Sequence, residues 1–226
     1  MDDAVRGLVR SGAMVAVIGV VVSVAATPAK AASVGVFSGT VTSITCVVCG
    51  NAVPDILDGT DRGLSPGDAY LGAFGFANDA VDVDPDPSAA FYEFGLDRAA
   101  FGFTNDVVTQ RDNNFVSAEL RVVDDGPDGD LFRFVLTNAL LTDVYSIELR
   151  DPTGAALDGT TIPFALTADQ FAERSFGYTF RDVLGINAAQ LEGTVDELTL
   201  VPIPGALPLL LTALAGGVAW RRLASG

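Results

Sequence analysis

The sequence predicts an all-β protein, folded as an antiparallel β-sandwich of jelly-roll-like form. Apolar and polar residues alternate with period two in several segments, and aromatic and β-branched residues fill the apolar positions. Clusters of aspartate, glycine and proline, which favour turns, separate these segments. Residues 32–200 are long enough for one sizeable core. Many short strands with one apolar face pack as two layers, so a sandwich is expected.

The alternation is clear after residue 131, where Phe132, Phe134 and Leu136 share one parity and Arg133 and Thr137 the other. Side chains of one parity point to one face of a strand, so this segment is half-buried. The same reasoning predicts strands at residues 34–44, 70–76, 90–94, 99–104, 116–122, 132–137, 145–150, 176–181 and 194–200. Turn-forming residues lie at 65–68, 124–130 and 151–154.

Two further patterns refine this prediction. Residues 167–174 favour a helical turn, because Thr167 and Gln170 have the spacing of a capping box. Gly39-Thr40-Val41 near the start recurs as Gly193-Thr194-Val195 near the end. We therefore expect the first and last strands to be neighbours.

Residues 1–31 have the layout of a secretory signal peptide. Arg6 and Arg10 precede an apolar stretch, and Ala29-Lys30-Ala31 has the small-x-small form of a signal-peptidase site. Ala29 and Ala31 are its two small residues, and we expect cleavage before Ala32. An uncleaved N-terminal anchor is the alternative, and the small residues favour removal.

Residues 201–222 are typical of a membrane-spanning tail. The 20 residues from Val201 to Trp220 carry no charge, and Arg221 and Arg222 follow. A helix of this size spans about 30 Å, the thickness of a bilayer core. A helix that begins at Pro208 would span only roughly 20 Å, so the segment is barely long enough to cross a bilayer. The residues before Pro208 would then form an extended stretch that leads to the helix. The arginines favour a cytoplasmic end. A buried C-terminal helix is the alternative, and the lack of a polar face disfavours it.

The domain between these segments is strongly acidic. The chain has 13 basic and 29 acidic residues. Removing the five basic residues of the two ends leaves 8 arginines and no lysine, and removing Asp2 and Asp3 leaves 27 acidic residues, a net charge of about −19. Such a surface repels nucleic acid and anionic lipid, so we expect neither as a partner. Solubility in a saline exterior is the simplest reason for this charge.

The composition excludes catalysis that depends on histidine. The chain has no histidine, which removes Ser-His-Asp and Cys-His catalysis and histidine metal ligands. Two cysteines are too few for a structural zinc site. Cys46 and Cys49 lie in a strand-rich region without a helix N-terminus to lower a thiol pKa, so a structural disulfide in an exported protein is favoured over redox catalysis. We expect no catalytic residues, and hence no enzyme.

Calcium is the one cofactor that the sequence leaves open. Asp82, Asp84 and Asp86 alternate with other residues, and Asp-rich loops can supply the oxygen ligands that calcium needs. The glycine and distal glutamate of an EF-hand do not follow in register. A second cluster, at 124–130, has the composition of an ordinary hairpin loop. Turn formation is therefore the simpler interpretation of both clusters, with structural calcium as the alternative.

The tail resembles a known family of sorting signals. Val201-Pro202-Ile203-Pro204-Gly205, the apolar run and then Arg221-Arg222 are similar to the VPLPA-type PEP-CTERM signals, with Ile203 in place of the usual leucine and Gly205 where alanine is common. The resemblance implies Sec-dependent export from a Gram-negative bacterium with an exopolysaccharide system. It also implies recognition of the tail by an exosortase, an integral-membrane cysteine transpeptidase. The resemblance covers residues 200–222 and implies no reaction for the domain.

These observations predict an exported surface or extracellular-matrix protein with a structural or adhesive role near exopolysaccharide. It would be held in the inner membrane by its tail as an intermediate, then reach the cell surface or the exterior. The alternative is a carbohydrate-binding module, in which aromatic residues such as Tyr70, Tyr92 or Phe94 stack on sugars unless they fill the core.

Overall fold

The computed structural model describes residues 32–46, 63–95, 98–104, 109–112, 115–138, 142–163, 165–181 and 187–203. Within them the chain is all-β and antiparallel, as predicted, with a short 3-10 helix η2. The elements are β1 (Ala32–Cys46), β2 (Ala69–Ala77), β3 (Ala89–Phe94), β4 (Ala99–Thr104), β5 (Thr109–Asp112), β6 (Phe115–Gly126), β7 (Gly129–Asn138), β8 (Asp143–Asp151), β9 (Leu166–Thr167), η2 (Ala168–Gln170), β10 (Glu173–Arg181), β11 (Asn187–Thr194) and β12 (Glu197–Ile203).

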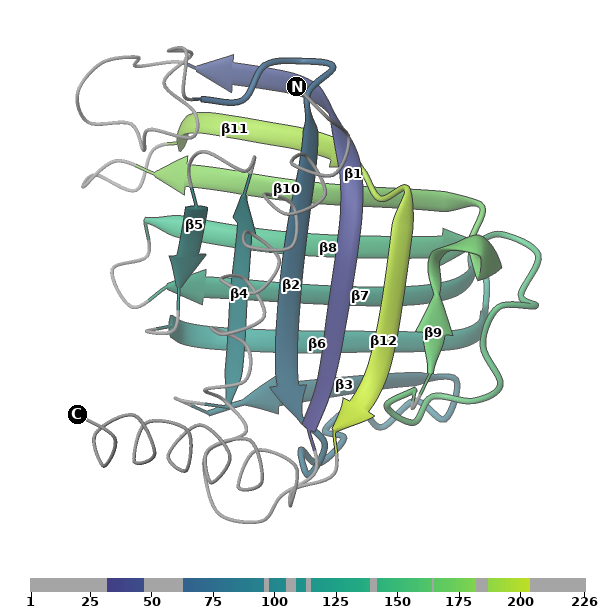
Figure 1. The fold of residues 1–226 in the computed structure, drawn as a ribbon. Coiled ribbons are helices and arrows are strands. Elements are labelled where there is room, and N and C mark those ends of the chain that lie inside the picture. The colour runs from purple at the N-terminus through teal and green to yellow at the C-terminus, as the bar shows by residue number, and fades with distance from the viewer. Residues whose placement is uncertain are drawn as a thin grey trace, which may run out of the picture.

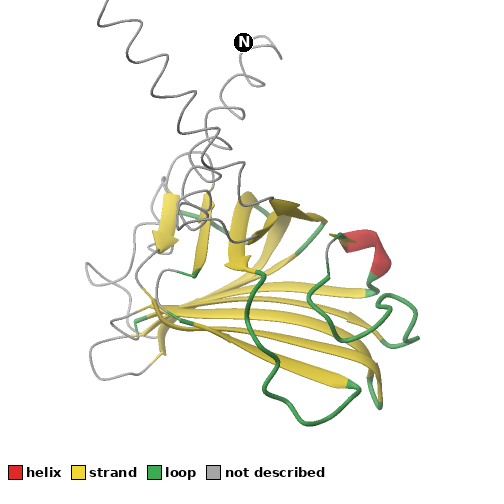
Figure 2. Ribbon diagram, turned by 90° about the horizontal axis from the view of Figure 1, so that it is seen from below, coloured by secondary structure: helices red, strands yellow, loops and turns green. Residues whose placement is uncertain are grey.

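The strands form two layers that lie across each other (Figure 1). The front layer has the order β5-β4-β2-β1-β12-β9, and the back layer has the order β3-β6-β7-β8-β10-β11-β1. β1 belongs to both, so all the strands share one hydrogen-bonded sheet. Figure 2 shows the two layers from another side. Layers that cross in this way are joined at corners by strands that pass from one to the other.

β1 makes this corner with a bulge and two glycines. Its first half pairs with β2 and β12, and its second half pairs with β11, with the register shifting between Val41 and Ser43. A bulge bends a strand and increases its twist. Gly39 and Gly193 lie where the backbones approach closely, since a Cβ on Gly39 would lie 1.8 Å from the Thr194 carbonyl oxygen. The recurring Gly-Thr-Val triplets thus meet at the corner.

The core between the layers is aromatic. In β7 alternate residues point inward, and Phe132, Phe134 and Leu136 are fully buried, whereas all six residues of β4 are buried. Phe101 of β4 contacts rings of both layers, with centroids 6.1 Å from Phe74 and 5.0 Å from Tyr145. Burying a large apolar side chain stabilises a fold by about 1.5–3 kcal/mol, so these rings supply much of its stability.

The structure confirms two further predictions. β1 and β12, the first and last strands, are antiparallel neighbours, with Val34 opposite Val201. Thr167 and Gln170 form the expected capping box, in which the Thr167 N–H donates to Gln170 Oε1 at 2.7 Å. The helical turn that follows is only the three residues of η2.

The structure differs from the expected jelly-roll order in the back layer. A jelly roll contains two Greek keys. In the front layer β12 returns beside β1, as the fourth strand of a Greek key does, but β3 of the back layer separates β2 from β4 in the sequence. In the back layer β6, β7 and β8 are successive antiparallel neighbours. The strand expected at 194–200 is also displaced, because Val195 and Asp196 separate β11 from β12, which continues to Ile203. The alternation of apolar and polar residues predicts that one face of each strand is buried, but it does not predict which strands pair.

Candidate functional sites

The start of the predicted sorting signal lies within the folded domain. Val201, Pro202 and Ile203 are the last residues of β12 and pair with Val34, Ser33 and Ala32 of β1. The side chain of Val201 is 45% exposed, and Pro202 is also exposed. β9 pairs with β12 only at Thr199 and Leu200, so Pro202, which lacks an N–H, lies where β12 has no second described neighbour.

The remaining residues of the sorting and cleavage signals lie outside the described residues. These are Pro204, Gly205, Arg221, Arg222, Ala29 and Ala31. The part of the chain that the structure describes contains no helix with the length and hydrophobicity of a membrane span. The predicted tail beyond Ile203 is not part of it, so the sorting signal stays a prediction.

Cys46 is the last residue of β1. Its sulfur takes part in a disulfide bond. Cys49 lies outside the described residues, so the predicted Cys46–Cys49 pairing stays a prediction.

The Asp82-x-Asp84-x-Asp86 series forms a chain of turns along the edge of β3. Each carboxylate accepts a hydrogen bond from the backbone N–H two residues on, at 2.9–3.0 Å. The Ser88 N–H and hydroxyl lower the pKa of Asp86 in this way. Asp82 Oδ1 also accepts from the Phe91 N–H at 2.9 Å, which fixes the loop to β3. These aspartates therefore serve turns and cover an exposed strand edge, the simpler of the two interpretations.

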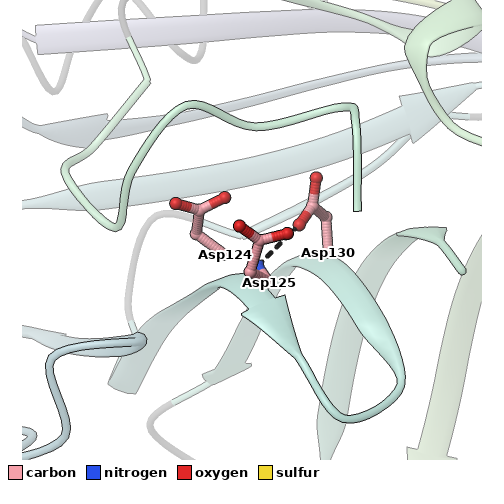
Figure 3. Close-up of side chains that lie close together, drawn as sticks. All are labelled: Asp124, Asp125 and Asp130. Carbon is pink, nitrogen blue, oxygen red and sulfur yellow. Dashed lines mark hydrogen bonds between the residues drawn. The ribbon is translucent and has the colours of Figure 1, made fainter. Parts of the chain in front are cut away.

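The carboxylates that the structure brings together belong to the second aspartate cluster. Asp124, Asp125 and Asp130 each place a carboxylate oxygen within 4.8 Å of the others (Figure 3). Among the described residues they form a group of three carboxylates close enough to hold one cation, and calcium prefers such oxygens. Burial, then the charges of Asp125 and Asp130, raise the pKa of Asp124. A calcium ion in this protein stays a prediction.

Asp130 already has a structural role in this cluster. It is fully buried, and it accepts from the N–H groups of Asp125 at 2.9 Å and of Ala156 and Leu157 at 2.8 Å. Asp151 next to it accepts from the hydroxyl of Thr153 and the N–H of Ala155, and these bonds lower the pKa of Asp151. The two carboxylates thus anchor the loop after β8 on the β6–β7 hairpin.

We expect Asp130→Asn to lower the free energy of unfolding by about 1–3 kcal/mol. An amide presents a donor where one carboxylate oxygen now accepts, so at least one of the part-buried N–H groups would lose its partner. Urea denaturation of the purified protein measures this loss. Asp128→Asn, at an exposed position of the same turn, is the matched control. Equal stability of the two variants would contradict the anchoring role.

A polar hollow lies on the outer face of the back layer. It has a volume of about 420 Å³ and is lined by Asp84, Phe91, Glu119, Arg121, Arg133 and Val135, and we call it the outer-face hollow. The aromatic residues that the sequence suggested for stacking on sugars belong to the core instead. They are Tyr70, Tyr92 and Phe94, which are 2%, 7% and 4% exposed. Phe91 is half-buried and faces outward instead. The alternation along the strand could have identified Phe91 as the outward-facing ring, because its neighbours Ala90, Tyr92 and Phe94 occupy the inward positions.

No protein-family model, no curated protein and no solved structure matches this chain.

Proposed function

We propose that this protein is exported by the Sec route and processed at its C-terminal sorting signal by an exosortase-type enzyme. It would then serve as a structural or adhesive protein at the surface or in the extracellular matrix of a Gram-negative bacterium, near exopolysaccharide. The observation that carries the proposal is the position of Val201 and Pro202. They are exposed at the end of the last strand, where the domain leads into the predicted tail.

The pairing of the domain's two ends supports this proposal. Ala32, the expected first residue after signal-peptide cleavage, is the register partner of Ile203 in the sorting motif. Both predicted processing segments therefore adjoin the domain at the same end of neighbouring strands. This arrangement suits a chain that is held and processed at one membrane at both ends.

We expect the double variant Pro202→Ala, Pro204→Ala to retain its unprocessed mass and to stay in the membrane fraction of the native host. Pro202 makes no N–H bond and its side chain is exposed, so alanine there preserves β12. Mass spectrometry and cell fractionation measure the result. Thr199→Ala, exposed on the same strand outside the motif, is the control for an effect on folding. Processing of the double variant at the normal rate would contradict the proposal.

A carbohydrate-binding module is the second candidate function, and the outer-face hollow favours it. The hollow combines an aromatic ring with charged side chains that can bond to hydroxyl groups. A glycan array probed with the full chain in the presence of calcium tests this candidate. Absence of binding to any glycan would reject it and leave the structural role.

A further inference from the structure

Positive charge is scarce in this domain, and part of it is gathered on one face. Of the 8 arginines between residues 33 and 200, Arg121, Arg133 and Arg150 lie on the neighbouring strands β6, β7 and β8. The residues that flank them, such as Leu120, Phe132 and Leu149, are fully buried. Strand alternation therefore places all three arginines on the outer face of the back layer.

Arg121 and Arg133 are direct register partners across β6 and β7. Like charges in this position destabilise a sheet. Glu148 offsets part of this repulsion, since its carboxylate lies 3.4 Å from Arg133 Nε and 3.3 Å from Arg150 Nη2. In the described part of the chain, Arg121 has no ion pair within 4 Å, and it is exposed. A carboxylate from outside that binds both Arg121 and Arg133 would supply the missing negative charge.

Phe91 lies on the other side of Arg121, as its register partner on β3. The Asp82 turn holds it in place, because the Phe91 N–H donates to Asp82 Oδ1 and its carbonyl accepts from the Val83 N–H, both at 2.9 Å. The same turn brings Asp84 to the hollow. The side chains thus form a row of aromatic ring, guanidinium and guanidinium, with the carboxylates of Asp84 and Glu119 also in the lining.

We propose that the outer-face hollow binds an acidic polysaccharide, one whose sugar rings carry carboxylate groups as uronic acids do. The carboxylate binds between Arg121 and Arg133, a ring face packs on Phe91, and sugar hydroxyls donate to Asp84 and Glu119. The volume of about 420 Å³ lies in the range of small-ligand sites, about 300–1,000 Å³. This inference depends on the proposed function only in placing the protein near extracellular polysaccharide.

The net negative charge of the domain opposes the approach of a polyanion, and screening decides the balance. The lining itself holds two arginines and two carboxylates, Asp84 and Glu119, so its formal charges balance. At 0.15 M salt the Debye length is about 8 Å, so the more distant carboxylates contribute little, whereas contacts at hydrogen-bond distance are screened much less. Direct contacts to Arg121 and Arg133 can therefore outweigh the repulsion from the rest of the acidic surface at physiological salt.

The test is calorimetric titration of the full chain, purified in detergent at 0.15 M salt. The probes are the β-1,4-linked mannuronate tetramer and the neutral mannose tetramer of the same linkage. We expect the acidic tetramer to bind roughly tenfold or more tightly than the neutral one, and Arg121→Gln to weaken its binding by roughly the same factor. Phe91→Ala should weaken both ligands. Arg174→Gln, which removes the same charge from β10 outside the hollow, should leave binding within about twofold.

Any of three results would overturn the inference. These are equal affinity for the two tetramers, no measurable binding of the acidic tetramer, and an Arg121→Gln variant that binds like the wild type. Failure of this titration with normal processing in the host would leave the proposed function intact. Conversely, failed processing would not alter the binding measured with the purified chain.

Discussion

Gly39→Ala is expected to lower the free energy of unfolding by about 3 kcal/mol or more, which is the upper part of the range for overpacked sites. The new Cβ would lie 1.8 Å from the Thr194 carbonyl oxygen and 2.5 Å from the Tyr70 hydroxyl oxygen. The first of these atoms is backbone, so no side-chain rotation relieves the clash. Moreover, the Tyr70 hydroxyl donates to the same carbonyl at 2.5 Å. The substitution therefore separates β1 from β11 at the corner that joins the layers.

Urea denaturation followed by tyrosine fluorescence and far-ultraviolet circular dichroism measures this effect. Gly95→Ala is the matched control, since the nearest atom to its added Cβ is Arg98 Cδ at 3.9 Å, an ordinary contact. We expect the control to change stability by no more than about 0.5 kcal/mol. A Gly39→Ala variant as stable as the control would contradict the role given to the corner.

Phe101→Ala is expected to lower the free energy of unfolding by about 3–5 kcal/mol. The ring is fully buried, and it contacts Phe37 and Phe74 of the front layer and Phe134, Tyr145 and Phe176 of the back layer. Its removal leaves a cavity between the layers, bordered by large rings that cannot collapse without shifting both sheets. The melting temperature should fall by roughly 10 °C, as calorimetry can measure.

Phe91→Ala is the control for this prediction, because it removes the same side chain from the outer face of β3. We expect it to change the free energy of unfolding by no more than about 1 kcal/mol. A similar loss in both variants would show that the contacts between the layers do not dominate stability. The same control separates binding from folding in the test of the outer-face hollow.

Periodicity predicted most strands because their inward residues are large and their outward residues polar. The middle of β7 and of β8 alternates in this way, although both strands have buried polar residues at their ends, and β4 matches its expected bounds. β11 was missed because Asn187-Ala188-Ala189-Gln190 favours helix or loop as readily as strand. Pairing with β1 on one side and β10 on the other decides its conformation. That information lies in distant parts of the chain.

The candidate sites were predictable to a lesser degree, since they depend on which strands are neighbours. The sequence shows Arg121 and Arg133 as separate outward residues, and only the register of β6 and β7 makes them opposed. Likewise, spacing favoured Asp82, Asp84 and Asp86 as a calcium candidate, whereas the hairpin after β6 brings Asp124, Asp125 and Asp130 together. Short-range spacing predicts turns well, but it does not predict which carboxylates meet across a hairpin.

The pairing of Ala32 with Ile203 also has a mechanical consequence. β12 runs toward Ile203 and has seven register pairs with β1, from Ala32 to Ser38. A force applied through the tail in the direction of the strand would load these pairs together, in shear. A force across the sheet would break them one at a time, starting at Ile203. A domain suspended from its C-terminal strand therefore resists tension best when the pull follows that strand.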